Sequence, residues 1–287
     1  MRPRLSCNSN LLADRPLTDA IRFLADAGYQ GVDINAETAP PIFPAPCPHL
    51  QPDASTAERR EVKRTSEQTG VALVSMNAHC SLVHPAGEKR QANVEFVREI
   101  LALAAEIGCG YVVVGGGRKE FYGWDADYWG RLVQSLRELL EAAAGNGATL
   151  AVEAGSQPGA LLFGTARVRK LFSTEGLETL RLVFDSAHFH IRGENVPGAF
   201  ETLSGHVGHV HLKDARGHVE DYSCPPLGMG DVDFRGLARS MERTGYSGFC
   251  AVEHEAFAWG HPSEPGRVLA DSRAFLESAF RSQGAAV

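Results

Sequence analysis

Four successive apolar segments of this 287-residue sequence end in side chains that can bind a divalent metal ion. The candidates are carboxylates and imidazoles: Glu153, then Asp185 and His188, then His209, His211 and Asp214, and finally Glu253 and Glu255. Ionisable groups rarely lie in buried strands unless they are paired or coordinated. One such residue alone has a simpler interpretation, for example Asp185 as a helix cap, but four segments in succession favour a metal site.

Side-chain direction narrows the ligand set without completing it. Alternate residues of a strand point to the same side. His209 and His211 therefore share a side, on which Lys213 follows, and Glu253 also shares a side with Glu255. This alternation does not show which residue of each pair would bind the metal ion. Three carboxylates with one imidazole favour Mn²⁺, Mg²⁺ or Co²⁺, and zinc stays open, although structural zinc sites use thiolates or more imidazoles. We expect one divalent metal ion.

These residues need a scaffold that brings several strand ends together. Eight apolar segments alternate with segments of helical pattern, at residues 4–8, 31–35, 71–79, 111–117, 148–155, 181–188, 206–214 and 248–256. The alternation predicts parallel strands, and the continuous hydrophobicity predicts burial on both faces. Eight such units indicate a (β/α)8 TIM barrel, which needs about 250 residues and carries its active site at the C-terminal strand ends.

The alternative fold is an open, doubly wound sheet. That fold often carries a Gly-rich phosphate loop after its first strand, but residues 4–16 contain no glycine. The glycine run 115–117 lacks the Walker pattern. We interpret it as a turn of close backbone approach at the barrel mouth, with a substrate-contacting loop as the alternative. No linker of Pro, Ser and Gly divides the chain, so we expect a single domain over residues 1–287.

Helix signals separate the apolar segments. Thr18 is a plausible helix start and Gly28 a stop. The longest pattern, residues 88–108, places a set of apolar residues on one helical face: Val94, Val97, Ile100, Leu101, Ala104 and Ala105.

Composition and charge exclude several classes of protein. The chain is 44% hydrophobic and 22% charged, which is ordinary for a globular protein. Its net charge of −7 and its lack of Lys/Arg runs argue against a nucleic-acid partner and for a small polar or neutral substrate. No apolar stretch approaches the roughly 20 residues of a membrane span. There is no signal-peptide pattern and no C-x-x-C pair, so we expect reduced thiols and a cytoplasmic protein.

Two unusual loops follow the second and fourth segments. Residues 36–55 are rich in proline and cannot form a regular helix. They are expected at the barrel mouth, where Ile42, Phe43 and His49 either cover the substrate or belong to an ordered surface loop. Residues 117–129 are aromatic. There Phe121, Tyr122 and Trp124 could form an apolar wall of the substrate site or a subunit contact of a homo-oligomer.

Longer segments of the chain resemble the xylose isomerase-like TIM barrels of sugar (phosphate) isomerases and epimerases. These are AGYQGVDI, VSMNAHCSLVHP, VFDSAH and HVHLKDARG at the second, third, sixth and seventh strands, and residues 226–255 leading into the eighth. The resemblance implies one metal ion held by Glu153, Asp185, His211 and Glu253. It also implies that His188 and Arg216 contact substrate. His79, in the third segment, and Trp124 are further candidates for substrate contacts.

The sequence departs from many relatives at two strand ends. It has Asp33 where they carry Glu, and Glu153-Ala154-Gly155 where they carry Glu-Asn-His, so we expect an altered substrate-facing wall. Endonuclease IV-type repair enzymes belong to the same superfamily but need three metals and a His after strand four. Here that strand ends in VVVGGG.

The resemblance implies a sugar isomerase or epimerase acting on a small sugar or keto-sugar. The metal would act as a Lewis acid on a carbonyl and its neighbouring hydroxyl. Glu153 and Glu253, each metal-bound through one oxygen and free at the other, would remove and return a proton through an enediolate. With a leaving group next to the carbanion, the same site would act as a keto-sugar or inosose dehydratase. A third alternative is a non-catalytic sugar-binding barrel, against which the intact ligand set argues.

Overall fold

Eight parallel strands close into a barrel in the computed structural model, which describes residues 4–37, 49–119, 124–260 and 264–281. The strands are β1 Arg4–Asn8, β2 Gly31–Asn35, β3 Ala72–Asn77, β4 Tyr111–Gly115, β5 Leu150–Glu153, β6 Arg181–Asp185, β7 Val207–Leu212 and β10 Phe249–Val252. Their order around the barrel is β1-β10-β7-β6-β5-β4-β3-β2. The predicted (β/α)8 barrel is confirmed, and the open doubly wound sheet is excluded because the sheet closes between β1 and β10.

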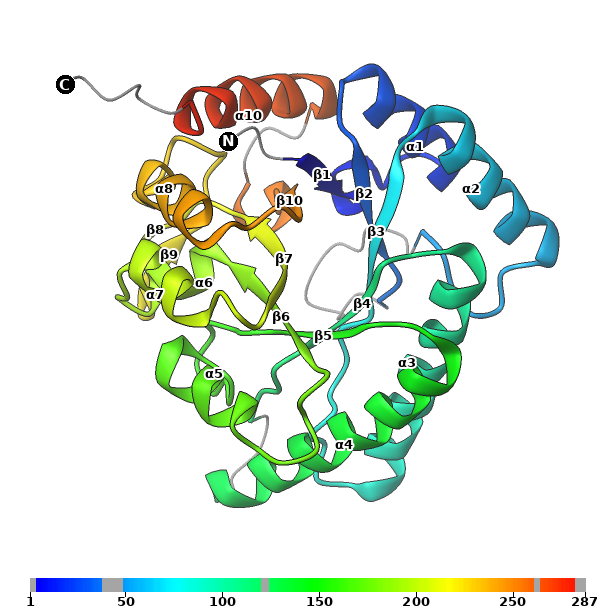
Figure 1. Cartoon of the computed structure of the whole chain (residues 1–287), viewed down its shortest axis with the longest axis vertical. Helices are drawn as coiled ribbons and strands as arrows, with labels where there is room; N and C mark the ends of the chain where they lie inside the picture. The colour runs from blue at the N-terminus through cyan, green and yellow to red at the C-terminus, as the bar shows by residue number, and fades with distance from the viewer. Residues whose placement is uncertain (1–3, 38–48, 120–123, 261–263, 282–287) are drawn as a thin grey trace.

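Long helices surround the strands (Figure 1). They are α1 Leu17–Asp26, α2 Thr56–Thr69, α3 Gly87–Ile107, α4 Asp125–Asn146, α5 Gly164–Phe172, α7 Val196–Leu203, α8 Phe234–Thr244 and α10 Pro265–Ala279. Shorter helices η1 Ser9–Leu12 and α6 Ser186–Ile191 directly follow β1 and β6, and α9 Ala256–Trp259 begins shortly after β10. A two-stranded hairpin follows β7, with β8 Arg216–His218 and β9 Asp221–Ser223. The segment pattern does not predict this hairpin, because its strands are short and exposed.

The helix signals agree with the structure to within a residue or two. Helix α1 begins at Leu17, one residue before Thr18, because Pro16 occupies the cap position. Gly28 follows its end with a φ of 79°, a conformation that favours glycine. On α3 the predicted apolar face is buried except for Ala105, which is half-buried at the edge of that face.

The strands bury both faces. Outward-facing side chains pack against the helices in one continuous core. Val113, Ala151 and Val183 form a separate cluster, which lies inside the barrel because inward residues alternate along each strand. The next inward residues towards the C-terminal ends of β5 and β6 are Glu153 and Asp185. The barrel therefore has an apolar layer directly beneath polar strand ends.

The glycine turn after β4 is a turn of close backbone approach, and the described cysteines are reduced, as the sequence predicts. A Cβ atom on Gly116 would lie 2.4 Å from Leu162 and 2.8 Å from the Glu153 carbonyl oxygen, so this is a turn of close approach. Five described cysteines are free thiols: Cys7, Cys80, Cys109, Cys224 and Cys250. Within the described ranges, none of the helices has the length and apolar character needed to cross a membrane.

Candidate metal centre and active site

Four side chains from neighbouring strand ends converge at the mouth of the barrel. Glu153 is the last residue of β5 and Asp185 the last residue of β6. His211 lies in β7, and Glu253 directly follows β10. One potential ligand atom from each lies within 4.8 Å of the others. These are the four residues that the family resemblance implies as ligands. The alternation of side chains along the strands leaves the choice within each pair open, and of these pairs His211 and Glu253 lie in the four-residue cluster. His209 lies with Asp33 and His211 in a second group that could hold a metal ion.

His211 is the centre of this cluster. Its Nδ1 atom lies 2.7 Å from Oε1 of Glu153 and 3.0 Å from Oε2 of Glu253. Burial alone would lower the pKa of His211, but the two carboxylates raise it well above its ordinary value. Burial likewise acts to raise the pKa of Glu153, and His211 with His79 holds it well below its ordinary value.

Three buried atoms of the cluster make no well-formed hydrogen bond, although Oε2 of Glu253 lies near Nδ1 of His211 and Nε2 of His211 lies near Asp33. They are Oδ2 of Asp185, Oε2 of Glu253 and Nε2 of His211. Burial raises the pKa of Asp185 well above its ordinary value. The positive charge of Lys213 opposes this rise, and the negative charges of Glu253 and Glu153 add to it. Buried, unpaired polar atoms are costly. A divalent cation would give these carboxylate oxygens a partner, and one imidazole with three carboxylates is a donor set that such ions take. The residues therefore fit a divalent metal ion.

The structure allows Asp185 to fill both roles that the sequence presents as alternatives, a helix cap and a metal ligand. Its Oδ1 accepts the backbone N–H of His188 at 3.0 Å and caps helix α6. Its Oδ2 faces the cluster without a partner. The helix-cap interpretation is confirmed, and it leaves one carboxylate oxygen free for a metal ion.

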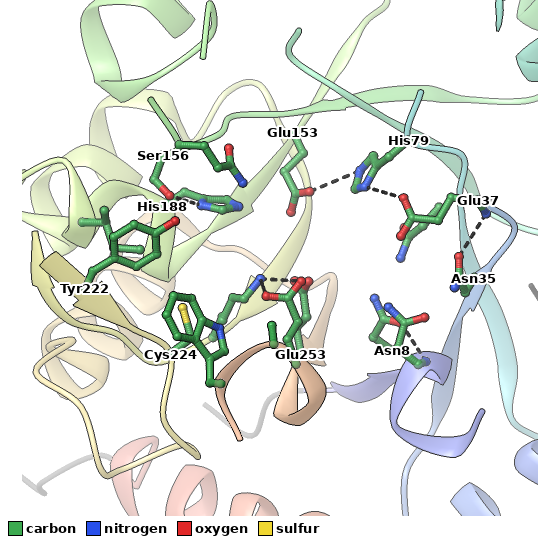
Figure 2. Close-up of a pocket in the computed structure, with 18 residues that line it drawn as sticks. Asn8, Asn35, Glu37, His79, Glu153, Ser156, His188, Tyr222, Cys224 and Glu253 are labelled. Carbon is green, nitrogen blue, oxygen red and sulfur yellow. Dashed lines mark hydrogen bonds and ion pairs between the residues drawn. The ribbon is translucent and has the colours of Figure 1, made fainter. Parts of the chain in front are cut away.

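The second oxygen of each glutamate is held by a cation. Oε2 of Glu153 lies 3.3 Å from Nε2 of His79, and Oε1 of Glu253 lies 3.1 Å from Nζ of Lys213. Figure 2 shows both contacts. Burial opposes the charge on His79, but Glu37 and Glu153 raise its pKa to about 10. In the protein without metal, the second oxygen of each glutamate therefore contacts a cationic side chain.

Glu153 and Glu253 of the cluster line a cavity of about 410 Å³, a size within the range of small-molecule sites. Asp185 and His211 are not among the residues that line it. His188 and His79 line this cavity, as the resemblance and the third segment suggest. The Nδ1 atom of His188 lies 2.8 Å from Oγ of Ser156. Burial lowers the pKa of His188 to about 4, so its ring is neutral at pH 7.

Three other residues that the sequence suggests as substrate contacts do not line the cavity. Arg216 is exposed on β8, where its guanidinium donates to the Met229 carbonyl, and Trp124 is 81% exposed before α4. Neither is among the residues that line the cavity. His49 is buried and contacts Ser9 Oγ at 2.8 Å, so it ties its loop to η1. Ile42, Phe43, Phe121 and Tyr122 fall outside the described residues.

Asp33 lies beneath the cluster. Its Oδ2 is 2.5 Å from Nε2 of His209, 2.9 Å from Oγ of Ser75 and 3.5 Å from Nε2 of His211. Neither Asp33 nor Ala154 lines the cavity. Both side chains are buried, so neither forms part of the cavity wall itself.

The first three strands also end in polar side chains, which the sequence shows at the same positions after apolar runs. β1, β2 and β3 end in Asn8, Asn35 and Asn77, and all three line the cavity. Tyr222 of β9 lies across the cavity from Asn8 and Asn35 (Figure 2), and Trp259 of α9 also lines the cavity. The hairpin that carries Tyr222 has no clear pattern in the sequence.

The fold and the site define a TIM-barrel protein with a candidate metal centre at its C-terminal strand ends. The chain belongs to the xylose isomerase-like TIM barrel family, whose model matches residues 21–279. It is 22% identical over 245 residues to fructoselysine 3-epimerase of Escherichia coli O157:H7, a match that covers 83% of this chain and 85% of the relative. It is also 23% identical over 237 residues to L-ribulose-5-phosphate 3-epimerase UlaE of Escherichia coli O157:H7 (strain EC4115 / EHEC), covering 81% of each.

A solved structure of the IOLI protein with a binding zinc atom has the same fold, with a TM-score of 0.75, 17% identity and coverage of 96% of both chains. At least one neighbour in fold therefore binds a divalent metal ion. The relatives confirm the predicted class of enzyme, a sugar isomerase or epimerase or a related lyase.

Proposed function

We propose that this protein is a divalent-metal-dependent keto-sugar epimerase or isomerase in which Glu153 and Glu253 transfer the proton. One observation carries the proposal: both glutamates direct one oxygen at His211 in the ligand cluster, and both line the cavity. β5 and β10 are separated in the barrel by β6 and β7. The two carboxylates therefore reach a bound sugar from different sides (Figure 2).

Glu153, Asp185, His211 and Glu253 would hold the metal ion. When bound, it would supply Lewis-acid stabilisation of negative charge on the substrate oxygens. One glutamate then removes the proton from the carbon beside the carbonyl, leaving an enediolate. The other glutamate donates a proton to the opposite face of the same carbon, which inverts its configuration. Return to the neighbouring carbon, with movement of a hydroxyl proton, would give the isomer.

His79 and Lys213 position these glutamates. Each cation contacts the glutamate oxygen that does not face His211, so each carboxylate is held at both ends. His188 is neutral and its ring is fixed by Ser156, which suits it to bind a substrate hydroxyl. The names of the relatives include both a phosphorylated and an unphosphorylated sugar, so they leave the substrate class open.

The test is proton exchange. Mn²⁺-loaded protein is incubated in D₂O with ketopentoses, ketohexoses and a keto-inositol, and the products are analysed by NMR and mass spectrometry. We expect deuterium at the carbon beside the carbonyl and formation of an epimer or isomer. Loss of water from the substrate would assign the dehydratase reaction to the same site. Sugar binding to metal-loaded protein without any exchange would contradict catalysis and support a sugar-binding barrel.

A further inference from the structure

The charged side chains of the cavity wall are mainly acidic. Its described lining includes four carboxylates and a single lysine: Glu37, Glu153, Glu253, Glu255 and Lys213. The cationic ring of His79 lies 3.3 Å from both Glu37 and Glu153. Residues 38–48, 120–123 and 261–263 contain neither lysine nor arginine, so those segments have no such cation to add. A divalent metal ion would be offset by its own three carboxylate ligands.

Lys213 is already paired twice. Its Nζ lies 2.7 Å from Oε2 of Glu255 and 3.1 Å from Oε1 of Glu253, and its side chain is only 6% exposed. Proteins recognise phosphate through arginine, lysine or free backbone N–H groups. A phosphate group carries about −1.5 to −2 charge at pH 7. At Lys213 it would lie beside two carboxylates, in a buried site where like charges repel strongly.

The usual phosphate site of this fold is also filled. TIM barrels often bind phosphate with the loops after strands seven and eight and a short extra helix. Here, after β7, the carboxylate of Asp214 accepts four backbone N–H groups at 2.9–3.2 Å, those of Ala215, Gly228, Gly230 and Val232. After β10, Glu255 directly precedes the short helix α9. The carboxylate of Asp214 thus takes up the backbone N–H groups of the loop after β7, and the carboxylate of Glu255 is paired with Lys213.

The remaining polar groups of the wall are neutral. Asn8 and Asn35 each line the cavity, and their side-chain carbonyl oxygens accept backbone N–H groups two residues further on, both at 3.0 Å. Their amide nitrogens remain as uncharged donors. Tyr222 and Trp259 add aromatic surface, with ring centroids 5.3 Å apart, and the buried Nε1 of Trp259 has no partner. Uncharged donors suit hydroxyl and carbonyl oxygens, and flat aromatic rings suit C–H faces.

We infer that the cavity is built for an uncharged, hydroxyl-rich keto-sugar and excludes its phosphorylated counterpart. This inference rests on the proposed function, since it names the substrate class of the same site. The specificity comes partly from repulsion, because Glu255 is paired with Lys213, and because Asp214 already binds the backbone N–H groups of the loop after β7.

The test compares matched pairs on Mn²⁺-loaded protein: L-ribulose with L-ribulose 5-phosphate, and D-fructose with D-fructose 6-phosphate, with a keto-inositol as a third neutral probe. Affinities are measured by calorimetry, and exchange is followed in D₂O. We expect at least one neutral probe to bind, and the free sugar to bind at least about tenfold more tightly than its phosphate. Tighter binding of either phosphate, or binding of no neutral probe, would overturn the inference.

The two readouts separate this inference from the proposed function. Binding of a neutral sugar without exchange would refute catalysis and leave the substrate class intact. Exchange that is faster with a phosphorylated sugar would support catalysis and refute the inferred substrate class. Glu255→Gln provides a second test, because it removes one of the two carboxylates on Lys213. We expect the preference for the free sugar to shrink at least about fivefold in this variant at unchanged metal content. The matched control, Glu67→Gln on the exposed surface of α2, should keep the wild-type ratio. An unchanged ratio in Glu255→Gln would contradict the role of repulsion.

Discussion

Oδ2 of Asp33 lies 3.5 Å from Nε2 of His211, the ring nitrogen that does not face Glu153 and Glu253. A carboxylate behind a ligand histidine orients its ring and makes the other nitrogen a better ligand, and loss of such a partner typically lowers metal affinity 10–100-fold. We expect Asp33→Asn to weaken Mn²⁺ binding by about this factor. Titration followed by electron paramagnetic resonance measures it, with Asp26→Asn on the exposed end of α1 as the control. Wild-type affinity in Asp33→Asn would show that the contact has no such role.

His211→Ala should remove the central ligand and empty or strongly weaken the metal site. Bound Mn²⁺ is measured after gel filtration. His218→Ala, on the exposed strand β8, serves as the control and should retain wild-type metal content. Unchanged stoichiometry and affinity in His211→Ala would exclude the assigned cluster.

Glu153→Gln and Glu253→Gln test the proton transfer. Glutamine keeps the size and one carbonyl ligand but cannot accept a proton at neutral pH. Loss of one positioned acid–base group costs about 10²–10⁴ in rate, so each variant should lose activity by this factor while still binding metal. Metal content is assayed in the same samples. A variant that binds metal and keeps most of its activity would show that its glutamate is not the base.

The two roles of Asp185 can be separated by a pair of substitutions. Asp185→Asn keeps an oxygen that can accept the His188 N–H, whereas Asp185→Ala loses the cap as well. Both should weaken metal binding. In the metal-free protein, Asp185→Ala should be less stable than Asp185→Asn by about 1 kcal/mol, the usual value of an N-cap. Urea denaturation measures the difference, and equal stability of the two variants would argue against the cap.

Stabilisation by metal should increase with pH. In the metal-free protein the pKa values of His211 and His79 are raised, that of His79 to about 10. A raised pKa gives stability that is present below about 6.5, the ordinary value for histidine, and is lost as pH rises towards the folded-state value. Metal binding to His211 requires the deprotonated ring. The increase in melting temperature caused by Mn²⁺ should therefore be larger at pH 8.5 than at pH 6, as measured by calorimetry. A shift that is constant or falls with pH would contradict this linkage.

The barrel itself follows from the sequence, because its signals are local. Apolar segments of strand length alternate with helical patterns, and each strand buries both faces, so the period and length of the segments are sufficient to predict eight parallel strands. The strand-end rule then identifies Glu153 and Asp185, since each ends an apolar run. Parity correctly places His209, His211 and Lys213 on one side of β7, and all three contact groups inside the barrel.

The alternation of side chains along β7 does not show how deep in the barrel each histidine lies. His209 and His211 point the same way, but only the register of β7 against β6 puts His211 opposite Asp185 and His209 opposite Val183. His211 thereby reaches Glu153, whereas His209 lies beside Asp33. The partners of the second glutamate oxygens, His79 and Lys213, likewise come from strands and loops distant in sequence. Trp124 and Arg216 illustrate the same limit, because the path of a loop depends on its contacts. Residue types and spacing thus determined the barrel and its candidate ligands, whereas closure of the barrel decided which of them meet, since contacts between strand ends depend on register and not on local pattern.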